Sequence, residues 1–122
     1  MQDFEIEFYK TETGEIPVNI FLSDLEKTDD KMLAKIMREI SLLKQNGNEL
    51  REPHTKPLKK GLFELRAKQG NNISRIIYFF FVGKKIILTN GFIKKTQKTP
   101  TKEIKLAEKY KDDYLKRNKE VC

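Results

Sequence analysis

Hydrophobic and polar residues follow a strand-like pattern in the central part of the chain. Residues 62–67 alternate between the two classes, which is typical of a strand with one buried face. Residues 76–82 form an apolar, aromatic-rich run, which is typical of a central strand covered on both faces. Apolar residues resume at 85–88, after a two-residue turn predicted at Gly83 and Lys84. The pattern predicts three consecutive antiparallel strands, the first two joined by the polar loop 69–72.

The N-terminal part of the chain is predicted to add one strand and two helices. Residues 3–9 alternate between aromatic or aliphatic and acidic side chains, so we expect a half-buried strand that joins the sheet. Pro17 suits the first position of a helix, and Thr28 or Asp29 can cap a second helix that ends near Gly47. The apolar stripes of these helices are Val18, Phe21, Leu22 and Leu25, then Met32, Leu33, Ile36, Met37, Ile40 and Leu43.

A loop and a last helix complete the predicted elements. Residues 48–61 contain two prolines and little periodicity, so they read as a loop. Thr99 is a candidate N-cap and Pro100 a first-turn proline of a helix that continues to about Lys116. Its predicted buried side is Ile104, Ala107 and Tyr110 or Tyr114. The fold class is α+β: a small antiparallel β-sheet with an N-terminal helical hairpin packed on it and a C-terminal helix.

Length and composition indicate one cytoplasmic domain spanning residues 1–122. A chain of 122 residues suffices for one core but not for two ordinary domains. No apolar run approaches 18 residues, and the acidic, alternating start does not resemble a signal peptide, so we expect no membrane partner. The single cysteine, Cys122, is the last residue, so there is no disulfide framework.

Charge is divided unequally along the chain. Residues 1–55 hold 7 Lys and Arg against 12 Asp and Glu, a net charge of −5, whereas residues 56–122 hold 18 against 6, a net charge of +12. A basic half of this strength predicts a surface for an anionic partner, of which nucleic acid is the commonest. A merely solvated basic surface is the alternative.

The predicted strand register brings two arginines together. If Lys68 pairs with Ile73, Arg66 lies directly opposite Arg75. Two like charges at opposed positions repel, so this arrangement is disfavoured unless an anion bridges them. The register therefore points to a site where an anion is expected.

The same register extends the positive charge to the third strand. Carried through the predicted turn, it places Lys94 on the face of Arg75, together with Asn90 and Phe92, and places Lys95 on the other face. One β-bulge would reverse that last step. We therefore predict a cationic patch made of Arg66, Arg75 and one or both of Lys94 and Lys95.

Further candidate residues surround this patch. His54, the only histidine, is a candidate proton carrier near a phosphate or else an ordinary loop histidine. Glu64 either forms an ion pair with the arginines or acts as a base. Lys59, Lys60 and Lys98 are candidates for binding RNA, and the start of the last helix also favours anions. We find no metal-ligand spacing, phosphate-binding glycine loop or nucleophile triad, so no cofactor is expected.

The segments GLFELR, SRIIYFFFVGKKIILTNGF and KKTQKTP, the last followed by KEI and a basic helix, closely resemble the phage-derived HigB-like branch of the RelE/ParE toxin superfamily. The resemblance runs over nearly the whole chain. It implies the RelE-like fold and a type II toxin–antitoxin system. It also implies a ribosome-dependent endoribonuclease that cuts mRNA in the 30S decoding site, using the 2′-hydroxyl of the RNA and neither a metal nor an enzyme nucleophile.

The resemblance also implies roles for the patch residues. Arg75 matches the strand arginine that clamps the scissile phosphate, and Arg66 would be a second clamp. Lys94 or Lys95 would neutralise the transition state or protonate the leaving oxygen. Two departures leave the general acid and base unassigned: Glu64 stands near the place of a family lysine, and a C-terminal tyrosine or histidine has a counterpart only if Tyr110 or Tyr114 supplies it.

The implied partners are mRNA on the ribosome and a cognate Cro-like helix-turn-helix antitoxin, with operator DNA bound only through the toxin–antitoxin complex. The competing hypothesis is a ParE-like gyrase poison or a toxin fold that only binds its partner, for which the arginine and lysine cluster is not required. A non-catalytic RNA-binding module ranks last, because residues 78–81 are predicted to be buried and not exposed for base stacking.

Overall fold

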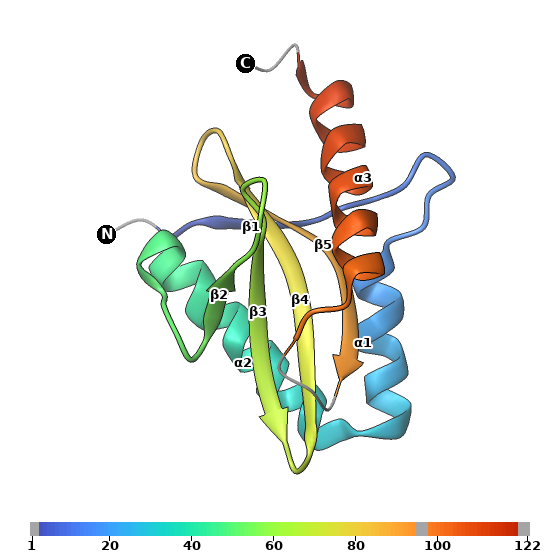
Figure 1. The fold of residues 1–122 in the computed structure, drawn as a ribbon, viewed down its shortest axis with the longest axis vertical. Coiled ribbons are helices and arrows are strands. Elements are labelled where there is room, and N and C mark those ends of the chain that lie inside the picture. Colours follow the sequence, from blue (N-terminus) through green and yellow to red (C-terminus); the bar gives the residue numbers. More distant parts are fainter. Residues whose placement is uncertain (1–2, 95–97, 120–122) are drawn as a thin grey trace.

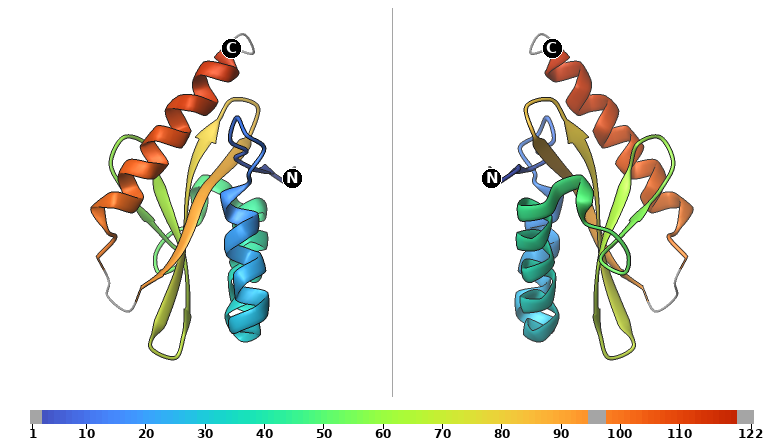
Figure 2. Two further views of the ribbon diagram at one scale, coloured as in Figure 1. Left: turned by 90° about the vertical axis from the view of Figure 1, so that its right-hand side faces the viewer. Right: turned by 90° about the vertical axis from the view of Figure 1, so that its left-hand side faces the viewer.

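A five-stranded sheet separates two helical layers in this computed structural model, which describes residues 3–94 and 98–119 (Figures 1 and 2). The strands lie in the order β1-β5-β4-β3-β2. Their bounds are β1 Glu5–Phe8, β2 Thr55–Pro57, β3 Phe63–Gln69, β4 Asn72–Phe81 and β5 Lys85–Lys94. The helices are α1 Pro17–Thr28, α2 Asp30–Asn46 and α3 Thr101–Arg117, with a short 3-10 turn at Gly47–Glu49.

The sheet is mostly antiparallel. β2, β3, β4 and β5 pair antiparallel in chain succession, whereas β1 pairs parallel with β5 at one edge. The predicted α+β class is confirmed, as is the expectation that the N-terminal strand joins the sheet. β2 was not predicted: it is a three-residue strand within the stretch 48–61 that reads as a loop, and its Pro57 and short length hide the strand pattern.

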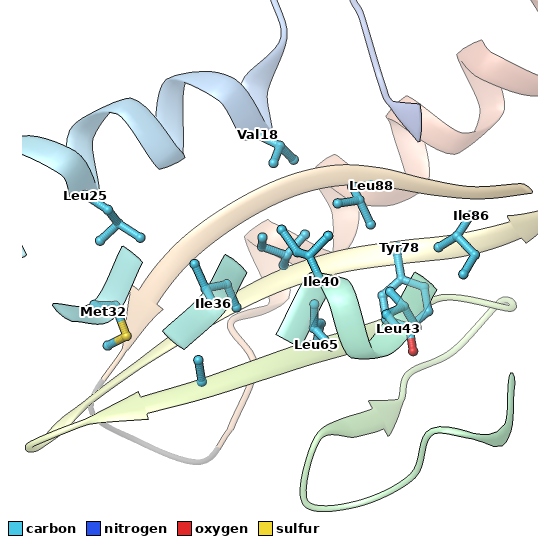
Figure 3. Packing of buried hydrophobic residues seen from close by; sticks show 12 residues of the cluster. Val18, Leu25, Met32, Ile36, Ile40, Leu43, Leu65, Tyr78, Ile86 and Leu88 are labelled. Atoms are coloured by element: carbon cyan, nitrogen blue, oxygen red, sulfur yellow. The ribbon is translucent and has the colours of Figure 1, made fainter. Parts of the chain in front are cut away.

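The central strand β4 contributes to two separate hydrophobic clusters. Ile76 and Tyr78 pack with the apolar stripes of α1 and α2 on one face of the sheet (Figure 3). Ile77 and Phe79 pack with Ala107 and Tyr114 of α3 on the other face. Burial on both faces thus explains the apolar run within β4, as predicted. Val82, which was included in the predicted run, instead follows the strand and is 53% exposed.

The helical stripe of α2 is narrower than the sequence indicates. Met32, Ile36, Ile40 and Leu43 are buried, whereas Met37 is 43% exposed. The Asp29 side chain accepts a hydrogen bond from the Met32 backbone amide, so Asp29 is the predicted cap. Pro17 stands at the predicted first position of α1.

The β4–β5 hairpin differs from the prediction in a way that leaves the site unchanged. Phe81 pairs with Lys85, so three residues and not two form the turn. Between Ile77 and Tyr78 the register shifts by one residue, because Thr89 is an extra residue on β5. The longer turn and the bulge compensate each other, and Arg75 pairs with Phe92 as the simple count predicts.

The C-terminal half of α3 is tied to the chain that follows β1. The Tyr9 hydroxyl donates to Asp113 Oδ2 at 2.5 Å, and Arg117 Nε donates to the same oxygen at 3.0 Å. Arg117 also donates to the Lys10 carbonyl and lies over the Tyr9 ring. Tyr110 stacks on Tyr9, with ring centroids 4.6 Å apart. These contacts hold the helix to the sheet by its side chains.

Burial, reinforced by Asp113, raises the pKa of Tyr9 from 10.0 to about 12. Because the folded state holds this proton more tightly, the resulting stability is complete below about pH 10 and is lost as the pH rises toward 12. Tyr9→Phe should lower the free energy of unfolding at pH 7 by roughly 1–2 kcal/mol, through the lost hydrogen bond. It should also lose stability less steeply than wild type above pH 10.

Urea titrations at several pH values test this expectation. Burial also raises the pKa of Tyr78 to about 12, but Tyr78 packs in the cluster under α1 and α2. The alkaline loss of stability of Tyr9→Phe is therefore compared with that of Tyr78→Phe, which removes the hydroxyl of a buried tyrosine on the sheet face away from α3. Equal alkaline slopes for wild type and Tyr9→Phe would show that Tyr9 does not titrate as described.

Candidate nucleic-acid interface

Arg66 and Arg75 lie directly opposite each other on β3 and β4, as predicted. The expected repulsion is relieved from within the chain, because Glu64 lies on the same face. Arg66 Nε donates to Glu64 Oε1 at 2.9 Å, and Arg75 Nη1 lies 3.7 Å from Glu64 Oε2. The carboxylate of Glu64 is therefore the anion that bridges the two arginines.

This ion cluster is almost completely buried. Neither Glu64 nor Arg75 has any exposed side-chain surface, and Arg66 retains 15%. Desolvation lowers the pKa of Arg75, Glu64 opposes that effect and Arg66 adds to it. Arginine nevertheless remains charged in proteins, so the cluster requires its carboxylate.

Thr99 connects the cluster to α3. Its hydroxyl donates to Glu64 Oε2 at 2.5 Å, and the residue is 7% exposed. Thr99 was predicted to cap α3, and this is wrong: the cap position is Pro100, without a side-chain hydrogen bond. The hydroxyl instead donates to the buried carboxylate of Glu64. This contact holds the segment before α3 against the cluster that contains the two arginines.

The first turn of α3 is held to β5 by a second polar contact. Asn90 Nδ2 donates to Glu103 Oε1 at 3.1 Å, and the Thr89 hydroxyl lies 2.7 Å from Asn90 Oδ1. Thr89 also lies within hydrogen-bonding distance of the Ile77 carbonyl, at 3.0 Å. The bulge residue therefore orients the side chain that holds the helix start.

Two lysines lie one step further along the same sheet face. Lys68 pairs with Ile73, which pairs in turn with Lys94, so these three residues form a cross-strand row next to the row that contains Arg66 and Arg75. Lys68 and Lys94 are exposed. Lys94 was predicted on this face, whereas Lys68 was missed as a site residue although the same register places it there. We call Arg66, Lys68, Arg75 and Lys94 the cationic face.

The remaining predicted lysines are distributed differently. Lys95 lies outside the described residues. Lys98 is exposed shortly before α3. Lys59 and Lys60 are exposed in the loop that precedes β3, and Lys60 Nζ lies 3.7 Å from Glu108 of α3. The structure thus gives Lys60 a partner on α3.

His54 has a partner that the sequence did not reveal. Its Nδ1 lies 2.8 Å from Oε1 of Glu39 on α2. The two residues line an open hollow of about 280 Å³ together with Arg66 and Lys68; Pro53, Ala67 and Ile73 complete the lining. The only sequence signal for Glu39 is its helical position between the buried Ile36 and Ile40, which does not identify a partner across 15 residues.

The two tyrosines considered as family counterparts belong to the packing under α3. Tyr114 contacts Phe79 and Phe81 edge-on, and burial raises its pKa above the ordinary value. Tyr110 stacks on Tyr9. Neither is among the residues that line the hollow at His54.

Residues 3–94 and 98–119 contain no group of three or more His, Cys, Asp or Glu side chains placed to hold a metal ion. Within the same ranges, no helix combines the length and apolar character needed to span a bilayer.

A mostly antiparallel sheet with a helical pair on one face and a C-terminal helix on the other defines a RelE-like fold. The chain belongs to the family of phage-derived Gp49-like proteins (DUF891), whose model matches residues 23–112. This family is part of the RelE/HigB-like toxin superfamily. The matched range includes His54, the cationic face and most of α3. A search of curated proteins finds no match.

The bridging role of Glu64 predicts a large stability effect. Glu64→Gln keeps the size of the side chain but leaves two opposed arginines without their anion. We expect a loss of about 3 kcal/mol in the free energy of unfolding, as for other broken buried ion pairs. Glu108→Gln is the matched control, because its partner Lys60 is 70% exposed and the ion pair should contribute less than about 1 kcal/mol. Urea titrations in which both variants unfold at the same midpoint would contradict the assignment.

Proposed function

We propose that this chain is the toxin of a type II toxin–antitoxin system and a ribosome-dependent mRNA endoribonuclease. The observation that carries the proposal is the cationic face, where Arg66 and Arg75 lie in one cross-strand row and Lys68 and Lys94 in the next. Membership of the toxin superfamily supports it. Four cations from three strands are suited to a phosphodiester, whose charge they can both bind and neutralise.

The reaction assigned to this face is transesterification within the RNA. The 2′-oxygen attacks the adjacent phosphorus, the P–O5′ bond breaks, and the products carry a 2′,3′-cyclic phosphate and a 5′-hydroxyl. This chemistry depends on alignment, on neutralising the pentacoordinate phosphate and on two proton transfers. It needs neither a metal ion nor a nucleophile from the protein.

The arginines supply binding and charge neutralisation in this scheme. Arg66 reaches solvent and makes the first contact with the phosphate, whereas Arg75 is fully buried against Glu64. A phosphate that engages Arg75 must therefore take the place of the Glu64 carboxylate, and the substrate exchanges one anion for another. Lys94 or Lys95 then protonates the leaving 5′-oxygen or neutralises the transition state, and His54 is the candidate for the other proton transfer.

The proposed partners follow from the same assignment. mRNA in the 30S decoding site is the substrate, and the exposed lysines of α3, among them Lys102, Lys105 and Lys109, steer the protein toward ribosomal RNA. A cognate Cro-like helix-turn-helix antitoxin neutralises the toxin, and operator DNA is bound only through the complex.

The complete burial of Arg75 favours a second candidate function. In that case the Arg75–Glu64 pair is purely structural. The protein then acts as a ParE-like gyrase poison, or it only binds its antitoxin.

A reconstituted translation system distinguishes the two candidates. Wild type should cleave mRNA only when ribosomes are present. Lys94→Ala, which alters an exposed side chain, and Lys95→Ala should reduce the cleavage rate. Arg66→Ala should reduce it by roughly a hundredfold through loss of a phosphate contact. Arg75→Ala is informative only with a parallel unfolding measurement, because its side chain is buried.

The matched control is Lys31→Ala, which removes an exposed positive charge from α2, on the other face of the sheet. It should cleave at the wild-type rate. Intact mRNA in the presence of a wild-type protein that still arrests growth would refute the endoribonuclease and favour the second candidate.

A further inference from the structure

The hollow beside β3 lies where its neighbour strand ends. β2 pairs with Phe63–Leu65, and one residue further along β3 the Arg66 amide donates to the His54 carbonyl at 2.9 Å. Beyond this point the edge of β3 faces α2, and Lys35 Nζ donates to the Lys68 carbonyl at 3.2 Å. The hollow therefore has residues of the cationic face on one side and of α2 on the other.

Glu39 determines which nitrogen of His54 is available. An ionised carboxylate only accepts hydrogen bonds, so the 2.8 Å contact requires the proton on Nδ1. In the neutral ring, Nε2 then carries the lone pair. The Glu39 side chain is 15% exposed and that of His54 is 39% exposed, so the carboxylate is held in place while the imidazole remains accessible.

The charges around the imidazole favour an anionic ligand. Arg66 and Lys68 face it from β3, and α2 contributes Lys35 and Arg38 through an adjoining hollow of about 250 Å³ that His54, Glu39 and Lys68 also line. Among these residues Glu39 is the only acid, and His54 already occupies one of its oxygens. A phosphate in the hollow would therefore meet several cations and one oriented imidazole.

We propose that this hollow binds a phosphodiester of the RNA and that Glu39 is the positioning residue that presents His54 Nε2 to the substrate. The inference deepens the proposed function and rests on it. Nε2 takes the proton of the 2′-hydroxyl as the O2′–P bond forms and the P–O5′ bond breaks. The leaving O5′ takes a proton from Lys94, which lies in the same cross-strand row as Lys68 and Ile73 of the hollow. Glu39 stabilises the imidazolium that results.

The tautomer of His54 tests the positioning role without any activity measurement. Because the chain has one histidine, tag-free protein labelled with ¹⁵N gives a single imidazole spectrum. The neutral ring of the wild type should show Nδ1 protonated and Nε2 unprotonated. Glu39→Ala should shift the ring toward the Nε2–H form, and Glu39→Gln, whose amide oxygen still accepts, should retain Nδ1–H. Glu26→Ala, on α1, should match wild type.

An Nε2–H ring in the wild type, or one tautomer unaffected by Glu39→Ala, would overturn the positioning role. The binding role is tested by titrating an RNA trinucleotide that 2′-O-methyl groups protect from cleavage. Its addition should shift the His54 ring signals and the Ala67, Lys68 and Ile73 amides, and Lys68→Ala should weaken the affinity several-fold. Signals that do not move at millimolar trinucleotide would refute a phosphodiester site in the hollow.

Ribosome-dependent cleavage then links the hollow to the reaction. Glu39→Ala should reduce the maximal rate roughly tenfold to a hundredfold, because the imidazole loses the carboxylate that orients it, with little change in the half-saturating ribosome concentration. Glu39→Gln should lie between it and wild type, and adding Glu39→Ala to His54→Ala should cost nothing more.

The outcomes separate the two proposals. If wild type cleaves and Glu39→Ala cleaves as fast, the positioning role fails and the endoribonuclease stands. If wild type does not cleave, the proposed function fails, and the roles of Glu39 and His54 in the reaction fail with it. The trinucleotide titration then decides whether the hollow is still a phosphodiester site.

Discussion

Two arginines face each other across β3 and β4, and the buried carboxylate of Glu64 makes that arrangement stable. The same carboxylate accepts the hydroxyl of Thr99, so it also determines where the chain approaches α3. One acidic side chain thus joins the register of the hairpin to the position of the last helix. The fully buried Arg75 in particular depends on a partner of opposite charge.

The proposed binding of RNA must compete with this internal neutralisation. In the free protein, Glu64 already neutralises part of the charge of the arginine pair. A phosphate therefore binds there only if its interaction with the guanidinium groups is more favourable than that of the Glu64 carboxylate. The side chains of Lys68 and Lys94 are instead exposed to water. They are suited to the long-range attraction of a polyanion, and the buried pair to discriminating between correct and incorrect placement of its phosphate.

The sequence predicted most of the fold and the centre of the candidate site, since both depend on alternation. The predicted register placed Arg66 opposite Arg75 and Lys94 on the same face, as observed. The predicted turn was one residue too short, but the bulge at Thr89 compensated for the extra turn residue. The sequence did not predict the contacts between elements that are distant in the chain. Thr99 was predicted as a cap because its carboxylate partner lies on β3, 35 residues away in the chain. Glu39 was missed because nothing in the sequence of α2 points to His54.

The packing residues and the exposed lysines of α3 lie at different positions on the helix. Ala107 and Tyr114 face the sheet, and the polar ties at Asn90–Glu103 and Tyr9–Asp113 hold its two ends. Lys102, Lys105, Lys109 and Lys116 are exposed and outside these ties. Mutations that add or remove outward lysines therefore change the electrostatic field of the molecule without a cost in packing. A surface charge that is independent of packing can change in evolution while the architecture stays constant.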